Sequence, residues 1–457
     1  MWRVIRIGVV LLIVLLVGGA PGSAAEEPGK GKVVLDLKGC IARAIATAPE
    51  MGEAGADIEL ASSRFAEARG HLFPTIEFLG LSGPVPQARG DQVSSPDSIN
   101  EHERWTYFVR GDATLIQPLY TFGKISENMK AATHGIEVDR AKKEQTRNEI
   151  ALKVEEYYNG LLLAREMQGL LRYVGDTLKD ARDKAQKLFD DGSPNVVLED
   201  LYKLDSYRGG VAGFLAEADK GERLALAALK ARLGLAADSD FDIVTTELVA
   251  GTETVADLSA SVATAKERRP EFRQIREGLK AREALVEAAR ADYFPDIFVA
   301  AYLSGAYSEK RERVNNPWVP DEFNHYWGGV ALGLRWKIDF GITNAKVAGK
   351  RAEFNRLEHT KSFAETNIPL QVKKYHLDLT TAEEKMNGTT QGYKNAKKWV
   401  VAAVSNFDFG IGPAKEIFDA LEQYAKMRAA YFQAVYERNL ARAGLDYATG
   451  TDPLQSR

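Results

Sequence analysis

The stretch Gln117-Pro118-Leu119-Tyr120-Thr121-Phe122-Gly123-Lys124 decides the fold, because its Phe-Gly pair returns 218 residues later as Phe340-Gly341. Further matches hold nearly the same spacing on both sides, and they are Pro49-Glu50 with Pro270-Glu271, Pro74 with Pro295, Phe189 with Phe407, and Gly192 with Gly410. A spacing that persists across most of a chain is the signature of an internal repeat. The sequence therefore predicts a duplicated fold.

The two halves have the same predicted plan of helix, strand pair, long helix, turn and return helix. In the first half these elements are Leu35–Arg69, Pro74–Leu81, Trp105–Leu119, Ile125–Asp191 and Val196–Leu233, with the turn at 192–195. In the second half they are Leu258–Asp292, Asp296–Ser308, His325–Ile338, Asn344–Asn406 and Ala414–Tyr447, with the turn at 407–413. Pro369 should kink or break the second long helix, since proline lacks an amide donor.

The lengths of the helices predict a rod. A helix of 67 residues, Ile125–Asp191, reaches about 100 Å at 1.5 Å per residue. Two shorter helices laid end to end match it in length. Both chain ends and the linker between the halves should then gather near the middle of the rod, with the strands at one end and the helical turns at the other.

Charge and cysteine content exclude several functions. The chain has 60 basic and 64 acidic residues among 457, a net charge of −4 without a basic block, so a nucleic-acid partner is not expected. One cysteine, Cys40, excludes an intrachain disulfide and multi-thiolate metal sites, and we interpret it as a small buried residue.

The N-terminus predicts a secretory signal peptide. Arg3 and Arg6 precede the apolar run Ile7–Ala20, and small residues follow up to Ala25, where we expect cleavage. An uncleaved anchor is the alternative, although the run is short for a bilayer that needs about 20 apolar residues. No N-terminal lipid anchor is indicated.

The predicted domain boundaries follow from the signal and the repeat. They are 1–25 for the signal peptide, 26–234 for the first repeat, 235–256 for an equatorial linker, 257–450 for the second repeat and 451–457 for a tail.

The strands leave two interpretations open. Tyr326, Val330 and Leu332 share one face of their strand, and Gly329 and Arg335 share the other. One interpretation is a soluble sheet with one buried face. The other is an outer-membrane barrel, but four strands cannot close one, since about eight is the smallest familiar number. A barrel therefore requires several copies of the chain.

The duplicated layout, the Gln117–Lys124 stretch and the Phe- and Gly-containing helical turns resemble the TolC family of outer-membrane efflux proteins over about Leu35–Gly450. The resemblance implies an α+β homotrimer whose twelve-stranded β-barrel, four strands from each subunit, lies in outer-membrane lipid and continues into a periplasmic α-helical barrel. It implies a passive export duct of a tripartite efflux or type I secretion system, with a periplasmic adaptor (membrane fusion) protein and an inner-membrane transporter as partners.

In this family the helical tips form the gate and meet the adaptor. The resemblance carries the adaptor-contacting role to the two turns, at Phe189, Gly192, Pro194, Gly410, Gly412 and Pro413. Glu416 and Asp419 match two acids that constrict the entrance, and their spacing places them on one helix face. The alternative for both is a solvated helix N-terminus, where acids suit the helix dipole.

Three tip positions match the family pattern unevenly. Asp200 matches an aspartate of the first hairpin, although the usual polar partners of that aspartate are missing here. Phe407 aligns with the gate tyrosine and Gly412 with an arginine. Closure is therefore expected to depend on packing of Phe407 and Phe409 instead of a hydrogen-bonded clamp.

No enzyme chemistry is expected. The six histidines form no HExxH pattern and have no cysteine partner, so the sequence predicts no catalytic residue, metal site or cofactor. A non-channel periplasmic coiled-coil scaffold or docking protein is the alternative function. The exported substrate and the identities of the adaptor and pump are not encoded in any motif.

Overall fold

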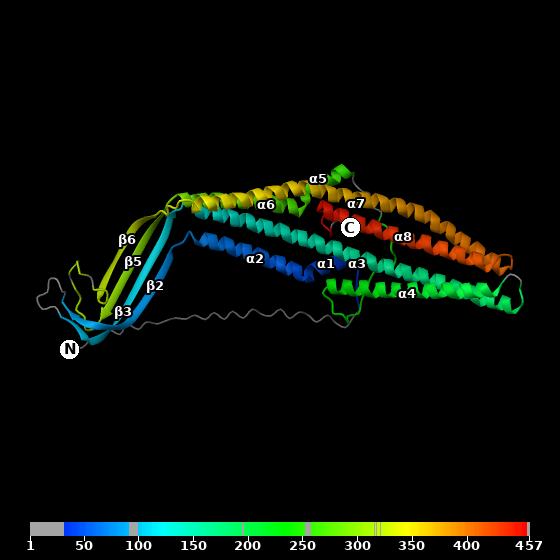
Figure 1. The fold of residues 1–457 in the computed structure, drawn as a ribbon, viewed down its shortest axis with the longest axis horizontal. Helices are drawn as coiled ribbons and strands as arrows, with labels where there is room; N and C mark the ends of the chain where they lie inside the picture. Colours follow the sequence, from blue (N-terminus) through cyan, green and yellow to red (C-terminus); the bar gives the residue numbers. More distant parts are fainter. Residues whose placement is uncertain are drawn as a thin grey trace.

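A computed structural model describes residues 32–90, 99–193, 196–251, 257–314, 316, 318–319 and 321–454. The chain is a long rod, with a β-sheet at one end and two helical turns at the other (Figure 1). The predicted signal peptide, residues 1–25, lies outside the described residues, as do Pro194 and the end of the tail.

The two halves contain the same order of strands and α-helices, and the second half has one additional 3₁₀ turn. The first half comprises β1 (Val33–Leu35), α1 (Leu37–Thr47), α2 (Pro49–Gly70), β2 (Thr75–Arg89), β3 (Ile99–Tyr120), α3 (Lys124–Asp190) and α4 (Leu198–Arg232). The second comprises β4 (Phe241–Ile243), α5 (Leu258–Arg268), α6 (Pro270–Arg290), the 3₁₀ turn η1 (Ala291–Tyr293), β5 (Asp296–Ser308), β6 (His325–Arg335), α7 (Ile342–Asp408) and α8 (Ala414–Thr449). The predicted duplication is confirmed.

The repeated Phe-Gly pair makes the turn from strand to long helix. Gly123 and Gly341, with φ of 92° and 133°, immediately precede α3 and α7. Glycine adopts such positive φ values without the steric cost that a Cβ atom would impose. This requirement explains why the pair occurs in both halves.

Each predicted first helix is two helices, so the single-helix prediction is wrong. Ala48 and Arg269, each directly before a proline, are extended, with ψ of 125° and 128°. The ring of Pro49 or Pro270 disfavours helical geometry in the residue before it, and each proline then begins a new helix.

Two other predictions about proline also need correction. Pro369 lies inside α7 without ending it, so the predicted break does not occur. The strand predicted to end at Leu81 continues to Arg89 through Pro84 and Pro86, with an irregularity after Pro86. Proline is tolerated there because β2 is an edge strand within the single chain and its pairing is irregular after Pro86.

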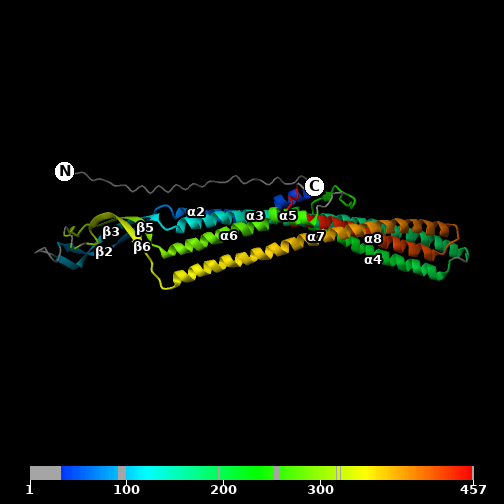
Figure 2. The same cartoon turned by 90° about the horizontal axis from the view of Figure 1, so that it is seen from above.

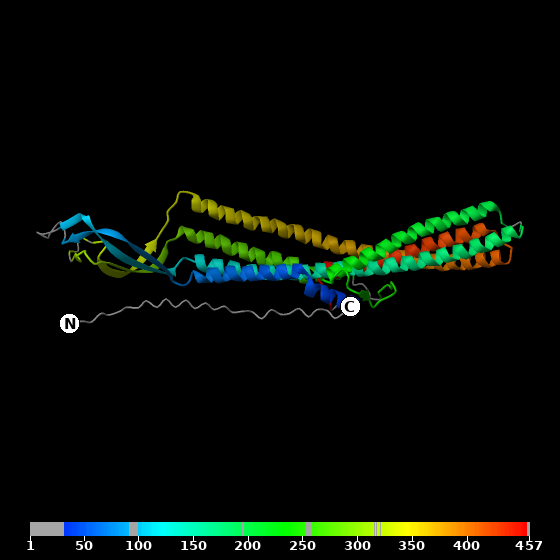
Figure 3. The same cartoon turned by 90° about the horizontal axis from the view of Figure 1, so that it is seen from below.

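The middle of the rod collects segments from both halves, as predicted. β1 and β4 form a parallel pair, and Arg165 of α3 contacts Asp242 of β4 at 2.7 Å. Near the chain's end, Arg147 of α3 contacts Asp452 at 2.9 Å. Figures 2 and 3 show α1, α5 and the C-terminus at this level of the rod.

The half of the rod between its middle and the helical tips has the main apolar core. α8 packs against both α7 and α3, and α4 packs mainly against α3, so the four helices follow the order α4, α3, α8, α7 (Figure 1). Side chains from all four helices are fully buried, among them Leu161, Leu204, Phe407 and Leu421. Towards the sheet, α7 diverges from α6 (Figures 2 and 3).

Candidate functional site

The β-sheet has one apolar and one polar face. It is antiparallel, in the order β2-β3-β5-β6, and paired residues such as Leu115, Ala301 and Val330 lie on the same face. The apolar face is exposed and includes Ile76, Phe78, Tyr107, Val109, Leu303, Tyr326, Val330, Leu332 and Leu334. So large an exposed apolar surface marks contact with lipid or with another protein.

The polar face contains linked charged groups. Arg110 lies 3.0 Å from a carboxylate oxygen of Asp112, and Ser304 lies 2.7 Å from the His325 Nε2 atom and 2.5 Å from Asp112. Arg335, at the helical end of the sheet, lies on the same face. A sheet with one apolar and one polar face can separate lipid from a water-filled interior.

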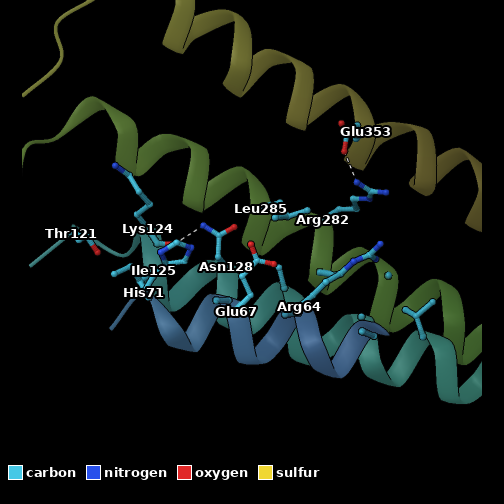
Figure 4. Close-up of a pocket in the computed structure, with 18 of the residues that line it drawn as sticks. Arg64, Glu67, His71, Thr121, Lys124, Ile125, Asn128, Arg282, Leu285 and Glu353 are labelled. Carbon is cyan, nitrogen blue, oxygen red and sulfur yellow. Dashed lines mark hydrogen bonds and ion pairs between the residues drawn. The ribbon is translucent and has the colours of Figure 1, made fainter. Parts of the chain in front are cut away.

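A cavity of about 1160 Å³ continues the polar face into the helical part of the rod. It is lined by α2, α3, α6 and α7 together with Phe298 and Arg335 of the sheet. Figure 4 shows Arg64 and Glu67 from α2, Lys124 and Asn128 from α3, Arg282 from α6 and Glu353 from α7 around it. Basic and acidic side chains both line the wall of this cavity.

Ion pairs hold the wall at the junction of sheet and helices. Lys124, the first residue of α3, lies 3.1 Å from carboxylate oxygens of both Asp292 and Asp296. Partial burial would lower the pKa of Lys124, but its hydrogen bonds to these carboxylates outweigh that effect and the pKa is raised. Arg282 and Glu353 form a second pair, between α6 and α7. The sequence pattern marks Lys124, directly after the Phe-Gly turn, but it does not indicate the carboxylate partners Asp292 and Asp296.

The two helical tips have the same backbone geometry. After α3, Gly192 has φ of 73° and donates to the Phe189 carbonyl at 3.0 Å, and Ser193 donates to Leu188. After α7, Gly410 has φ of 71° and donates to the Phe407 carbonyl at 3.0 Å, and Ile411 donates to Asn406. Both are Schellman caps, which need a left-handed residue at the glycine.

The repeated phenylalanines occupy different environments. Phe407 is 2% exposed in the core between the hairpins, whereas Phe189 is 38% exposed. Phe409 is 79% exposed in the single chain, so its part in closing the tip stays a prediction. Phe418 of α8, in the same core as Phe407, contacts Tyr207 of α4 with ring centroids 5.2 Å apart.

The acidic candidates differ in their contacts. Asp200 accepts a hydrogen bond from the Val197 amide at 3.3 Å and is therefore a helix cap of α4. Glu416 and Asp419 are exposed in the first two turns of α8. No ion pair to either is found among the described residues. These two carboxylates are thus available to a neighbouring copy or to solvent.

Gly412 and Pro413 shape the start of α8. The Gly412 amide donates to the Asn406 carbonyl at 3.2 Å, and a Cβ atom on Gly412 would lie 3.1 Å from that of Asn406. Pro413 precedes the first residue of α8. Both residues therefore hold the second tip in a tight turn.

An apolar groove of about 850 Å³ lies between the tips and the middle of the rod, and it is lined by α3, α4 and α8. Its lining includes Met167, Val174, Leu178, Tyr207, Phe214 and Phe418. Gly210 and Gly221 of α4 also line it, and their lack of side chains helps keep this surface open.

The remaining candidate chemistry is limited. Burial raises the pKa of the Cys40 thiol to about 12, which keeps it protonated and unreactive. Within the described residues, no group of three or more potential ligands is placed to hold a metal ion. None of the described helices has the length and apolar character that crossing a membrane requires.

Comparison with known families gives one clear match. A family described as "Outer membrane efflux protein" matches residues 40–198 and 262–451, which covers most of each half but not the return helix α4. No curated protein sequence matches this chain.

Solved structures with a similar fold are outer-membrane channels. The outer-membrane channel OprN superposes with a TM-score of 0.76 at 15% identity, covering 92% of this chain and 90% of that one. The Campylobacter jejuni CmeC channel gives 0.74 at 14%, covering 94% and 91%. The open state of the Neisseria gonorrhoeae MtrE channel gives 0.74 at 15%, covering 93% and 94%.

Proposed function

This chain belongs to the outer membrane efflux protein family, and we propose that three copies of it form the export duct of a tripartite efflux or type I secretion system. As a family member it is an outer-membrane channel, with its helical part in the periplasm. The observation that carries the proposal is a four-stranded sheet with two open edges and an exposed apolar face.

The open edges require further copies. β2 and β6 each pair with only one strand of the described sheet. In hydrocarbon no water satisfies a bare strand edge, and each unsatisfied backbone group costs several kcal/mol. If β6 of one copy pairs with β2 of the next, three sheets of four strands close a twelve-stranded barrel without edges.

The helices support the same closure. α4 and α7 are the two end helices of the row α4, α3, α8, α7 near the tips, and both expose large apolar side chains. They include Tyr202, Phe214 and Leu224 on α4, and Leu377, Trp399 and Val401 on α7. Pairing α4 of one copy with α7 of the next would cover these side chains and complete a ring of helices around a lumen.

The tips are the proposed gate. Three-fold symmetry would bring the Glu416 and Asp419 carboxylates of all copies around one opening, and such a ring favours cations over anions. Asp200 and Phe407 would act through helix capping and packing, since they are engaged within the subunit. The exposed tip residues Phe189, Gly192, Gly410 and Pro413 are proposed to meet the periplasmic adaptor that links the duct to its inner-membrane transporter.

Planar-bilayer recording tests the gate. The double variant Glu416→Gln/Asp419→Asn should lose cation preference and pass more anion current, because the acidic ring is neutralised. Glu217→Gln on the exposed side of α4 is the matched control and should behave as the unmodified protein. Unchanged ion preference in the double variant would reject the ring.

The scaffold alternative is tested by solubility. A channel subunit should be found in outer-membrane fractions as a trimer that dissociates on heating. A protein that is fully soluble and monomeric without detergent would contradict the proposal, because the apolar sheet face would then have no lipid to cover it.

A further inference from the structure

The described parts of the connection between β5 and β6 fold back across the polar face of the sheet. The connection leaves β5 after Ser308 and enters β6 at His325, at the end of the sheet farthest from the helices (Figure 1). Its described residues are 309–314, 316, 318–319 and 321–324. We call the anchored parts, 309–314 and 321–324, the inner strap.

One buried ion pair fixes the two sides of the inner strap to each other. The guanidinium of Arg311 contacts both carboxylate oxygens of Asp321 at 3.0 and 3.2 Å. Their side chains are only 14% and 5% exposed. Arg311 also donates to the Pro86 carbonyl of β2 at 2.6 Å and lies over the Phe323 ring. The pair is therefore bidentate, shielded from water and bound to the sheet.

Further contacts attach the inner strap to the polar face. Glu322 contacts Arg110 of β3 at 2.5 Å, and the Phe323 ring lies 4.8 Å from that of Phe108. The Glu312 amide donates to the Ala88 carbonyl of β2 at 3.1 Å. Arg110 and Phe108 have the strand parity of Asp112, which places both on the polar face.

Burial identifies the side on which the inner strap lies. Val85, Ser304, Ala306 and Ser308 are all on the polar face, and each is at most 8% exposed in a single chain. Opposite them, Tyr107, Val109 and Tyr307 on the apolar face are more than 60% exposed. The inner strap thus covers the side of the sheet that would face the lumen and leaves the lipid side bare.

We propose that the inner strap forms a second constriction, at the outer mouth of the channel, and that the Arg311–Asp321 pair holds it there. The inference rests on the proposed function, because it takes the polar face as the lumen wall. Three copies would narrow the mouth from three sides. Since the inner strap has three basic and four acidic residues, and Arg311–Asp321 and Arg110–Glu322 are paired, its net charge is close to zero. This constriction therefore selects by solute size, whereas the tips select by charge.

Polymer exclusion from one side of a bilayer tests the inner strap. Polyethylene glycols of increasing size are added to the barrel side of the reconstituted protein, and the largest one that lowers conductance gives the width of the mouth. Arg311→Ala/Asp321→Ala should raise both the conductance and this size limit. Replacing 309–324 by Asn-Gly, a short hairpin connection, should raise them further. Glu77→Gln, on the polar face of β2 but outside the inner strap, is the matched control.

The outcomes separate this inference from the proposed function. If the unmodified protein forms no channels, the proposed function fails. If it forms channels and both strap variants remain trimers with an unchanged barrel-side size limit, the inner strap is not a constriction. If the strap variants change the size limit only for polymers added on the tip side, the inner strap does not constrict the outer mouth and the inference fails.

Discussion

The two helical hairpins share one backbone design but differ in how they are buried. Both end in a glycine cap with φ near 70°, and equivalent residues are separated by the same spacing in sequence. Yet α8 has 17 buried residues along its length, whereas α4 has only Leu201, Leu204 and Leu229. The two repeats thus share the turn geometry but differ in how much of the return helix is buried.

The position of each return helix explains the difference. α8 lies between α7 and α3 and must be apolar on two sides. α4 packs mainly against α3, so its other side remains for a neighbour. Of the two return helices, α8 therefore lies inside the subunit's core, whereas α4 keeps one side uncovered in the single chain.

The largest expected effect comes from the repeated phenylalanines. Phe407→Ala removes a fully buried ring and should destabilise the tip by about 3–5 kcal/mol. Phe189→Ala, the matched change in the first hairpin, should cost less than about 1 kcal/mol, since its ring is partly exposed. Hydrogen exchange of the α7 and α8 amides for Phe407→Ala, and of the α3 and α4 amides for Phe189→Ala, measures the difference. Equal losses would show that assembly buries Phe189 as deeply as Phe407.

The tip glycines should instead behave alike. Gly192→Ala and Gly410→Ala each force a Cβ atom into left-handed geometry, at a cost of about 1–2 kcal/mol. A Cβ atom at either position meets nothing within 4 Å, so the cost is in the backbone alone. Export assays should show a defect in both variants, while barrel insertion stays normal. Lost insertion would place these glycines in a different role.

The smallest effect concerns the ion pair that joins the two hairpins. Lys184 of α3 contacts Asp408 at the end of α7, and both side chains are substantially exposed. Exposed pairs contribute about 0–1 kcal/mol and are screened by salt. A double-mutant cycle of Lys184→Met and Asp408→Asn, read by hydrogen exchange at low and high salt, measures the coupling. A coupling above that range, insensitive to salt, would mean that assembly buries the pair.

Much of the fold could be predicted from periodicity and spacing. Helical periodicity predicted 67 residues for the first long helix, and α3 has that length. The helix break at Pro49 and Pro270 was missed because apolar periodicity continues through a bend, although both prolines were visible in the repeat. The strand beyond Leu81 was missed because Pro84 and Pro86 suggest a loop unless the strand is known to be at an edge.

The site was less predictable. Phe189 and Phe407 occupy the same place in the repeat, so no local pattern distinguishes the exposed ring from the buried one. The distinction depends on which helix lies opposite. The inner strap was likewise hidden, because Arg311 and Asp321 are ordinary charged loop residues until folding brings them together.

The equal lengths of α3 and α7 set the two tips at the same distance from the sheet. Each has 67 residues and starts at an equivalent Phe-Gly turn, so both tips stand at one height above the sheet. Four residues inserted into one helix alone would raise its tip by about 6 Å. The turns around the lumen would then no longer lie in one plane. Natural relatives of different rod length should therefore have gained or lost residues in both repeats together.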